Sequence, residues 1–307
     1  MANKQMKITV VGAGTIGLSF AALHLTKNTD CTVTIFDTRQ DLQQYVQQTL
    51  PGYLVDVDHD ACMRRLSFSS KLEDAVKDAA IIQEQGPENP AFKIDIWPQI
   101  ERHAPKDALL WSSTSGIPAS QQSRDMQDKS RLVIVHPFNP PHIMPVLEVV
   151  PSPETSQVVV DRTMEYWRKH DRSPVVLQKE CTGFVANRLA FALYREACSL
   201  VTQGVVSVED LDEIVQTSMG PRWTVAGPFK SYHAGGGEGG LKSFMDKIGG
   251  TVQGCWDASE EDIRKGNISV GGGWEAHICR QTDAAYGVVD TADRDTKTRK
   301  VLEAVKN

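Results

Sequence analysis

Short runs of apolar residues alternate with amphipathic stretches through the first half of the chain. Apolar runs separated by helices are typical of a parallel sheet that is covered on both faces. Right-handed crossovers between such strands produce a doubly wound domain. We therefore expect a Rossmann-type α/β domain, with strands over residues 6–11, 31–37, 79–85, 107–113 and 131–135 and a shorter one over 64–69.

The pattern changes after the segment SPVVLQKE, residues 173–180. The next segment, TGFVANRLAFALYREACSLVTQ, predicts one long helix with Thr182 as its N-cap. A second helix is predicted by SVEDLDEIVQTS, with Ser207 as its cap. The remaining sequence is helical or glycine-rich. We expect two domains, an α/β domain over residues 1–181 and a mainly helical domain over residues 182–307.

Composition narrows the class of protein. The 307 residues carry a net charge of −6 and no polybasic block, which argues against nucleic acid or an acidic membrane surface as a partner. No apolar run approaches the ~20 residues that span a bilayer, and the first residues lack the pattern of a secretory signal. Six widely spaced cysteines without a CxxC pair indicate reduced thiols. We expect a cytoplasmic protein that binds neither nucleic acid nor a membrane.

The segment VVGAGTIG places Gly12, Gly14 and Gly17 between an expected strand and an expected helix. Asp37 ends the next expected strand, 20 residues after Gly17. In that context the glycines predict a dinucleotide site, where they permit the tight turn, the approach of a pyrophosphate and close helix–strand packing, respectively. Asp37 would bind the adenosine ribose and repel a 2′-phosphate, which favours NAD over NADP, although Arg39 could soften that preference. The alternative is a tight turn without a ligand.

A histidine, His136, follows the expected strand at the edge where open α/β sheets bind ligands. Glu148 stands 12 residues later among apolar neighbours, where a carboxylate needs a partner. A hairpin-like return through the proline-rich segment between them could bring Glu148 against His136. Such a pair keeps one ring nitrogen protonated and leaves the other free as a base. The alternative is a histidine that is satisfied by nearby backbone.

These motifs together resemble the 3-hydroxyacyl-CoA dehydrogenase superfamily, in the family's order and over both expected domains. The family carries H-x-x-N-P after a strand, then a glutamate in L-V-E-V, and also an S-x-T-S turn and a G-F-x-x-N-R helix start. In this chain the corresponding residues are His136, Asn139, Pro140, Glu148, Ser112 to Ser115 and Gly183 to Arg188.

The resemblance implies a division of roles. His136 would take the proton of the substrate C3 hydroxyl, Glu148 would orient His136, and Ser115 and Asn187 would hold the reacting oxygen. The alternatives are that Ser115 caps a turn and that Asn187 bonds only to backbone. NAD would be bound by the glycine turn and by family positions, here Gly12, Gly14, Thr15, Ile16, Gly17, Asp37, Glu88, Lys93, Ser115 and Asn139. For Glu88 and Lys93 the alternative is an ordinary surface pair.

Within the superfamily, the segments HPFNPPHIMPVLEVVP and PRWTVAGPFKSYHAGGGEGGLKSFM are similar to the branch of L-gulonate 3-dehydrogenase (lambda-crystallin) and L-carnitine dehydrogenase, which act on free hydroxy acids. Residues 41–63 contain four aspartates and neither lysine nor arginine, so this segment would repel the phosphates of coenzyme A. The acidic run over residues 56–60 lacks the glycine and glutamate of a calcium loop, and we expect no metal. We read it as a solvated loop.

Three hypotheses remain open: an NAD-dependent dehydrogenase of a free 3-hydroxy acid, a short 3-hydroxyacyl-CoA dehydrogenase, and a non-catalytic NAD-binding crystallin-like protein. Arg222 is the candidate ligand of the substrate carboxylate. The alternative is that it bonds to carbonyl groups at a helix end. Trp223, Phe229, Tyr232 and Trp256 could cage a quaternary ammonium if they converge. The glycine-rich segment 233–243 is expected to be a mobile connection. Family members dimerise through the second domain, so the resemblance implies a homodimer.

Overall fold

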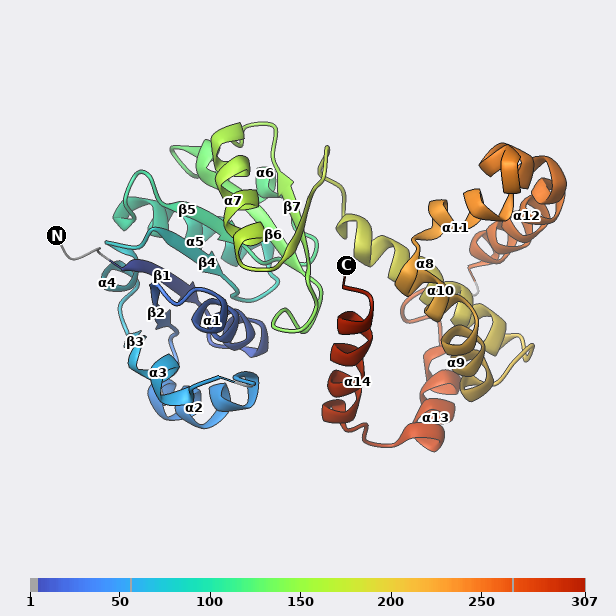
Figure 1. The fold of residues 1–307 in the computed structure, drawn as a ribbon, viewed down its shortest axis with the longest axis horizontal. Coiled ribbons are helices and arrows are strands. Elements are labelled where there is room, and N and C mark those ends of the chain that lie inside the picture. The colour runs from blue at the N-terminus through green and yellow to red at the C-terminus, as the bar shows by residue number, and fades with distance from the viewer. Residues whose placement is uncertain (1–4, 56, 267, 307) are drawn as a thin grey trace. The chain divides into compact units, whose positions relative to one another are not determined.

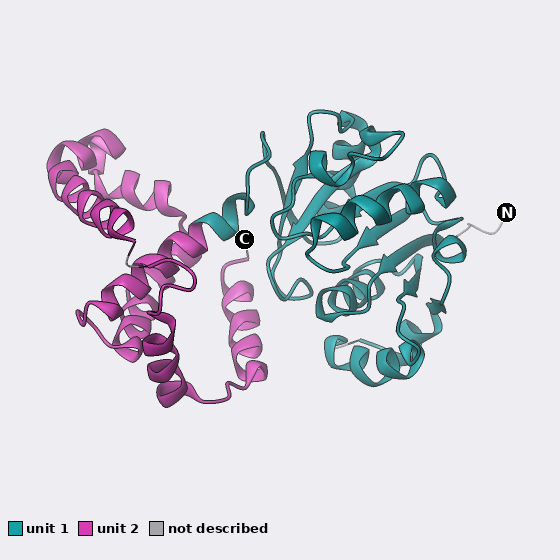
Figure 2. Cartoon of the chain, turned by 180° about the vertical axis from the view of Figure 1, so that it is seen from behind, with its two compact units in different colours: residues 1–188 teal, residues 189–307 magenta. Residues whose placement is uncertain are grey.

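The computed structural model describes residues 5–55, 57–266 and 268–306. The chain divides into two compact units, with unit 1 ending at Arg188 and unit 2 beginning at Leu189 (Figure 2). The division lies within the long helix α8 (Phe184–Thr202). Asp56, one member of the acidic run, is outside the described residues.

Unit 1 is built on an eight-stranded sheet, among the described residues, in the order β3-β2-β1-β4-β5-β6-β7-β8 (Figure 1). Every neighbouring pair is parallel except β6 and β7. The expected doubly wound α/β fold is thereby confirmed, with two strands, β7 and β8, that run antiparallel to the others. The strands are β1 (Met6–Val11), β2 (Cys31–Phe36), β3 (Leu66–Ser69), β4 (Ile81–Glu84), β5 (Leu109–Ser112), β6 (Leu132–Pro137), β7 (Val146–Pro151) and β8 (Ser173–Val176).

Helices cover both faces of this sheet because alternate strand residues point to opposite sides. Trp111 of β5 belongs to the core on one face, whereas its neighbour Leu110 belongs to the core on the other. Both residues are fully buried. The first face is covered by α1 (Thr15–Lys27), α2 (Leu42–Thr49) and α7 (Gln157–Lys169), and the second by α4 (Leu72–Val76), α5 (Pro90–His103) and α6 (Ala119–Gln122).

The acidic segment after β2 is short and mostly helical. It comprises α2, the turn η1 (Leu50–Tyr53) and α3 (His59–Arg64). Asp58 caps α3 by accepting the backbone N–H of Ala61 at 3.0 Å. The expected solvated loop therefore gives way to a helix from His59 onward.

A chain of hydrogen bonds crosses the core of unit 1 from α7 through α1 to the sheet. His24 Nδ1 lies 2.7 Å from the Tyr166 hydroxyl, and its Nε2 lies 2.8 Å from Gln83 Oε1. Gln83 Nε2 in turn donates to Ser113 Oγ at 3.1 Å. His24 is 1 % exposed. Burial lowers the pKa of His24 to about 4, with His170 acting in the same direction and the Gln83 bond opposing it.

Because of His24, we expect the protein to lose stability in mild acid. Unfolded chains bind the proton below about pH 6.5, but folded His24 does not do so until about pH 4. The free energy of unfolding should therefore fall as the pH is lowered from 6.5 to 4, by on the order of 3 kcal/mol from this group. Urea unfolding at pH 7 and at pH 4.5 measures the change. His24→Gln should make the free energy of unfolding less dependent on pH, whereas the exposed His103→Gln should leave that dependence unchanged. An equal pH dependence in the original protein and both variants would contradict the assignment to His24.

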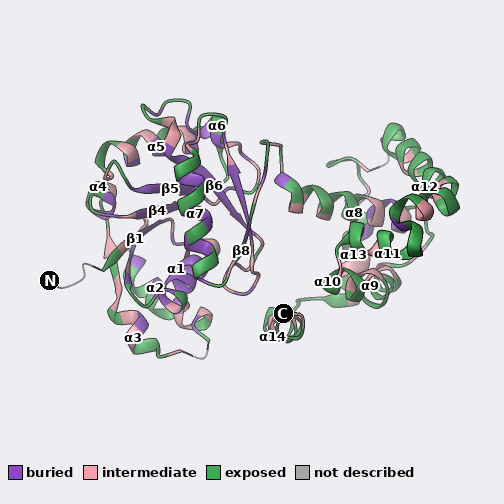
Figure 3. Cartoon of the chain, turned by 45° about the horizontal axis from the view of Figure 1, so that its top comes forward, coloured by how far each residue is buried: buried purple, intermediate pink, exposed green. Residues whose placement is uncertain are grey.

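Unit 2 consists of helices and has little core of its own. Its buried apolar cluster contains Cys198, Val201 and Ile278, while most of its helical surface is exposed (Figure 3). Ser207 accepts the N–H of Asp210 at 3.1 Å, which confirms it as the cap of α9. The helices after α8 are α9 (Val208–Thr217), α10 (Met219–Val225), α11 (Pro228–Gly235), α12 (Gly240–Lys265), α13 (Glu275–Tyr286) and α14 (Thr291–Ala304).

The glycine-rich segment of unit 2 is a packed turn rather than the expected mobile connection. A single 3-10 turn, η3 (Gly237–Gly239), joins α11 to α12. A Cβ atom on Gly236 would lie 1.7 Å from the carbonyl oxygen of Gly240, and one on Gly240 would lie 2.4 Å from the ring of His233. The glycines are therefore needed for close approach of the two helices. In the described parts of the chain, no helix is long and apolar enough to cross a bilayer.

Candidate active site

The glycine turn lies between β1 and α1 at the carboxyl ends of the parallel strands. Gly12 has a positive φ of 109°, and a Cβ on Gly17 would lie 1.9 Å from the Gly12 carbonyl oxygen. A Cβ on Gly14 would meet no atom within 4 Å. Gly14 is also the N-cap of α1 and offers no side chain to its first N–H groups. These groups are free to bind an anion, so the turn fits a dinucleotide pyrophosphate, with Thr15 and Ile16 in the first turn of α1.

Asp37 stands directly after β2 and faces this turn. Its Oδ2 accepts the N–H of Ala13 at 2.7 Å, and its Oδ1 accepts the N–H of Arg39 at 3.0 Å. The carboxylate is thus fixed beside the glycine turn by two backbone donors. This is the position from which an acidic residue binds a ribose in dinucleotide-binding folds.

His136 and Glu148 face one another in the sheet. They are directly paired residues of the antiparallel strands β6 and β7, and His136 Nδ1 lies 2.7 Å from Glu148 Oε2. Both are buried, at 4 % exposure each. The hairpin-like return expected from the sequence is therefore present. With Nδ1 donating to the carboxylate, Nε2 is the nitrogen left without a proton in a neutral ring.

The second oxygen of Glu148 binds the start of α8. Glu148 Oε1 accepts the N–H of Val185 at 2.9 Å and of Ala186 at 3.0 Å. Burial raises the pKa of Glu148, but the bonds from His136 and from these two amides outweigh it, so the net pKa lies below its usual range. The group therefore remains a carboxylate at neutral pH. Glu148 thus contacts the histidine and the start of the helix at the same time.

Thr182 is not the N-cap of this helix. α8 begins at Phe184, and both Gly183 and Phe184 have positive φ values, 73° and 54°. The left-handed pair shifts the helix start two residues beyond Thr182. It also buries the Phe184 ring completely, with its centroid 5.2 Å from that of His136. Phe184 was missed because an aromatic residue at a helix start carries no sequence signal of such a contact.

Ser115, Asn187 and Glu88 meet in the loop after β5. Asn187 Nδ2 donates to the carbonyl oxygen of Ser115 at 3.0 Å. Glu88 Oε1 accepts the hydroxyl of Thr114 and the N–H groups of Ser115 and Gly116, at 2.5, 2.9 and 3.1 Å. Glu88 therefore holds the backbone of the loop that carries Ser115. Asn139 follows β6 and is exposed beside the cis bond to Pro140.

Lys93 occupies a different environment from the surface pair considered in the sequence. It is 1 % exposed, and its Nζ lies 2.8 Å from both carboxylate oxygens of Glu84, which is fully buried. It also donates to the carbonyl oxygen of Gly86 at 3.2 Å. The surface-pair interpretation is wrong for Lys93, whose partner is Glu84 and not Glu88. A carboxylate at the end of the expected central strand β4 (Ile81–Glu84) was the signal that could have revealed this pair, because a buried carboxylate needs a partner.

The residues considered for substrate recognition in unit 2 are dispersed over its surface. Arg222 is exposed on α10. In this region the ring of Tyr232 packs against that of Phe244, with centroids 5.0 Å apart. Trp223, Phe229 and Trp256 are 38 %, 79 % and 60 % exposed. These aromatic residues do not form a cage within unit 2.

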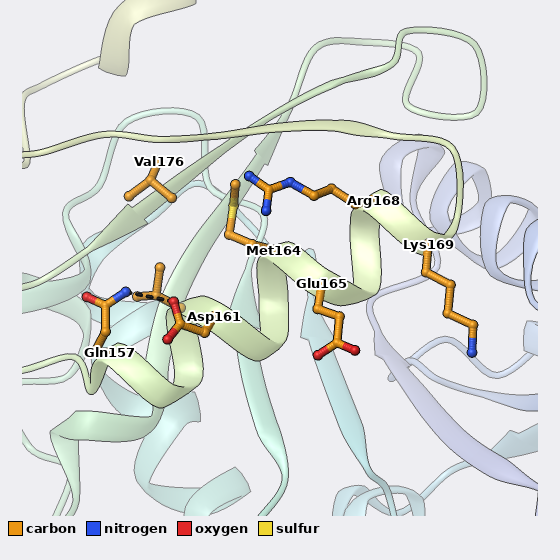
Figure 4. A pocket seen from close by; sticks show the side chains of 8 residues that line it. Gln157, Asp161, Met164, Glu165, Arg168, Lys169 and Val176 are labelled. Atoms are coloured by element: carbon orange, nitrogen blue, oxygen red, sulfur yellow. Dashed lines mark hydrogen bonds between the residues drawn. The ribbon is translucent and has the colours of Figure 1, made fainter.

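A surface pocket of unit 1 lies apart from these groups. It runs along α7 with Val176 of β8 on its other side (Figure 4), and it has a volume of about 580 Å³. Its lining mixes the acids Asp161 and Glu165 with the bases Arg168 and Lys169. No residue of the glycine turn or of the His136–Glu148 pair lines it.

The chain matches two domain profiles of one family. Residues 7–181 match the profile "3-hydroxyacyl-CoA dehydrogenase, NAD binding domain", and residues 183–265 match "3-hydroxyacyl-CoA dehydrogenase, C-terminal domain". The chain belongs to the 3-hydroxyacyl-CoA dehydrogenase family. It is accordingly an NAD-dependent oxidoreductase that acts on a small molecule.

Individual members of the 3-hydroxyacyl-CoA dehydrogenase family are similar over most of the chain. A protein of Gibberella moniliformis named 3-hydroxyacyl-CoA dehydrogenase is 35 % identical over 86 % of this chain and 83 % of its own. L-carnitine dehydrogenase of Streptomyces griseus is 32 % identical over 97 % of this chain and 89 % of its own. The structure of an NAD⁺-dependent dismutase, 5-formyl-3-hydroxy-2-methylpyridine 4-carboxylic acid 5-dehydrogenase, is similar with a TM-score of 0.76, at 26 % identity and 98 % coverage of both chains.

Proposed function

We propose that the protein interconverts a free 3-hydroxy acid and its 3-keto acid, with NAD as the hydride acceptor. The observation that carries this proposal is the buried pair of His136 and Glu148, 2.7 Å apart. It stands at the end of β6, on the same edge of the parallel sheet as the glycine turn. That edge is where ligands bind in open α/β sheets.

In this proposal His136 accepts the proton of the substrate hydroxyl at Nε2. Glu148 fixes the ring by accepting the Nδ1 proton and stabilises the imidazolium that forms. NAD supplies the hydride chemistry, and the protein supplies binding and alignment. The ring of Phe184 packs against that of His136 and limits its rotation. Ser115 and Asn187, which are linked at 3.0 Å, would hold the reacting oxygen.

The NAD contacts form part of the same proposal. The glycine turn would hold the pyrophosphate, and Asp37 would bind the adenosine ribose. Ser115 and Asn139 would line the nicotinamide site. Glu88 would act by holding the Ser115 loop, because its carboxylate oxygen already accepts three hydrogen bonds from that loop. Lys93 would support the turn after β4 through Glu84 and Gly86 rather than reach the dinucleotide with its amine.

Two observations favour a free acid over a coenzyme A thioester. The segment from Asp41 to Met63 carries no lysine or arginine, and its described residues include only the short helices α2 and α3 and the turn η1, so it offers no cation to the phosphates of coenzyme A. Relatives named L-carnitine dehydrogenase align over nearly the whole chain. Arg222 is the proposed ligand of the substrate carboxylate, since a guanidinium matches a carboxylate in two hydrogen bonds.

A substrate panel tests this proposal. NADH formation would be followed with carnitine, gulonate and 3-hydroxybutyrate, and NADH consumption with acetoacetyl-CoA. We expect turnover of at least one free acid and little turnover of the thioester. Preference for acetoacetyl-CoA would support the acyl-CoA alternative. The similarity to the Gibberella protein is consistent with that alternative. NADH binding without turnover on any compound would indicate the crystallin-like alternative.

We also propose that two chains associate through unit 2. Its helices expose large apolar side chains that a single unit does not cover, and such surfaces mark protein–protein contacts. Light scattering of the purified protein should give twice the 33.9 kDa of one chain. The most exposed of these side chains on α8, α11 and α12 are Leu189, Phe191, Phe229 and Trp256, at 60 % to 79 % exposure.

A further inference from the structure

Arg39 stands two residues after Asp37, the residue expected to bind the adenosine ribose. An arginine in this region accommodates the 2′-phosphate in NADP-dependent folds of this type. In this structure the guanidinium is already engaged. Its Nε lies 2.7 Å from Asp41 Oδ1, and its Nη2 lies 3.1 Å from Asp41 Oδ2. The Arg39 Cζ atom also lies 3.5 Å from the centroid of the Tyr45 ring.

Asp41 binds Arg39 instead of capping α2 with its side chain. It is the N-cap residue of α2, and an aspartate at that position normally accepts a backbone N–H of the first turn. Here the Asp41 side chain makes no cap hydrogen bond, because both of its oxygens bind Arg39. The hydrogen bond from Arg39 lowers the pKa of Asp41, and the same bond raises the pKa of Arg39. The pair therefore stays ionised at neutral pH.

We propose that Asp41 is a positioning residue for cofactor choice: it holds Arg39 against Tyr45, neutralises its charge and so denies NADP a ligand for the 2′-phosphate. Asp37 and Asp41 then exclude NADP in two different ways. Asp37 repels the phosphate from the ribose position. Asp41 removes the cation that would otherwise compensate, since a guanidinium bound in two hydrogen bonds to a carboxylate has little left to offer a phosphate.

One substitution at Asp41 should release Arg39 from this exposed ion pair. The consequence should be measurable as a change in NADPH affinity. The full-length protein would be titrated with NADH and NADPH, with the fluorescence of the reduced nicotinamide as the readout. Asp41→Asn should tighten NADPH binding by about tenfold, as expected for one charge–charge contact near a surface. NADH affinity should change by less than about twofold, because NADH has no phosphate at that position.

A double-mutant cycle decides whether Arg39 carries the effect. In an Arg39→Gln background, Asp41→Asn should no longer improve NADPH binding. Asp60→Asn is the matched control, because it removes one negative charge from the first turn of α3 without touching Arg39, and it should leave the NADPH affinity unchanged. The gain from Asp41→Asn should also shrink in 0.5 M salt, since screening weakens exposed charge pairs.

Asp41→Ser guards against a folding defect, because serine keeps a good N-cap for α2 while releasing Arg39. It should reproduce the gain for NADPH. The proposal is overturned if both Asp41 variants bind NADPH as the original protein does. It is equally overturned if Asp41→Asn improves binding as much in the Arg39→Gln background, or if Asp60→Asn gives the same gain.

Discussion

Replacing His136 with glutamine is expected to lower the rate of hydroxy-acid oxidation by about 10²–10⁴-fold, the usual contribution of a positioned general base. Glutamine keeps a polar side chain of similar reach, so Glu148 retains a donor and need not be buried alone. It cannot accept the hydroxyl proton as imidazole does. NADH affinity should stay within about twofold, because the glycine turn and Asp37 follow other strands, β1 and β2.

The measurements are steady-state rates on the best substrate of the panel and a fluorescence titration with NADH. His59→Gln is a suitable control, since this histidine of the same unit bonds to the carbonyl oxygen of Leu54 and should leave the rate unchanged. A His136→Gln protein that keeps more than about a tenth of the activity would rule out the base assignment. Equal loss of rate and of NADH binding would point instead to a structural role.

Replacing Lys93 with methionine should produce the largest loss of stability. The substitution leaves the carboxylate of Glu84 buried without its cation, and breaking a buried pair in this way costs about 3–5 kcal/mol. Urea unfolding followed by tryptophan fluorescence would measure it, because Trp97 and Trp111 are fully buried in unit 1. The double variant Glu84→Gln/Lys93→Met should recover most of the loss, since no charge then remains buried.

Lys77→Met is the matched control for the Lys93 substitution. Lys77 pairs with Asp74 at 2.8 Å, but both side chains are more than half exposed, so losing the pair should change the free energy of unfolding far less than losing the buried pair. A Lys93→Met protein as stable as the Lys77→Met protein would contradict the view that the buried pair holds the end of β4 and the start of α5.

Much of the fold follows from the sequence because each central strand is an apolar run between clear turn signals. The run over residues 131–135 predicts β6. Leu132 and Ile134 pack into the core on one face and Val133 and Val135 into the core on the other, which explains why the four positions after Arg131 are all apolar. The helix start at Phe184 was harder to place. Threonine is a common N-cap residue, so Thr182 was a reasonable choice. Two residues with left-handed backbone follow it, and the residue types alone do not reveal that conformation.

The candidate site was predictable where a polar residue in an apolar segment required a partner. Glu148 among apolar neighbours needed a partner, and His136 was the group within reach of a short return. Arg39 shows the opposite case. Its sequence neighbours allowed a solvated side chain, and only the placement of Asp41 and Tyr45 at the start of α2 shows that it is held. Gly236 and Gly240 likewise suggested freedom in the sequence, whereas their spacing in the structure shows contact.

The two amides that Glu148 binds at the start of α8 bear on how unit 1 can be produced alone. A gene fragment that stops at residue 181, where the NAD-binding profile ends, would lack Val185 and Ala186 and would leave Glu148 Oε1 without its two donors. Extending the fragment to Arg188 retains them, together with Phe184. The shorter fragment should therefore be the harder one to obtain folded, although it contains every strand of the sheet.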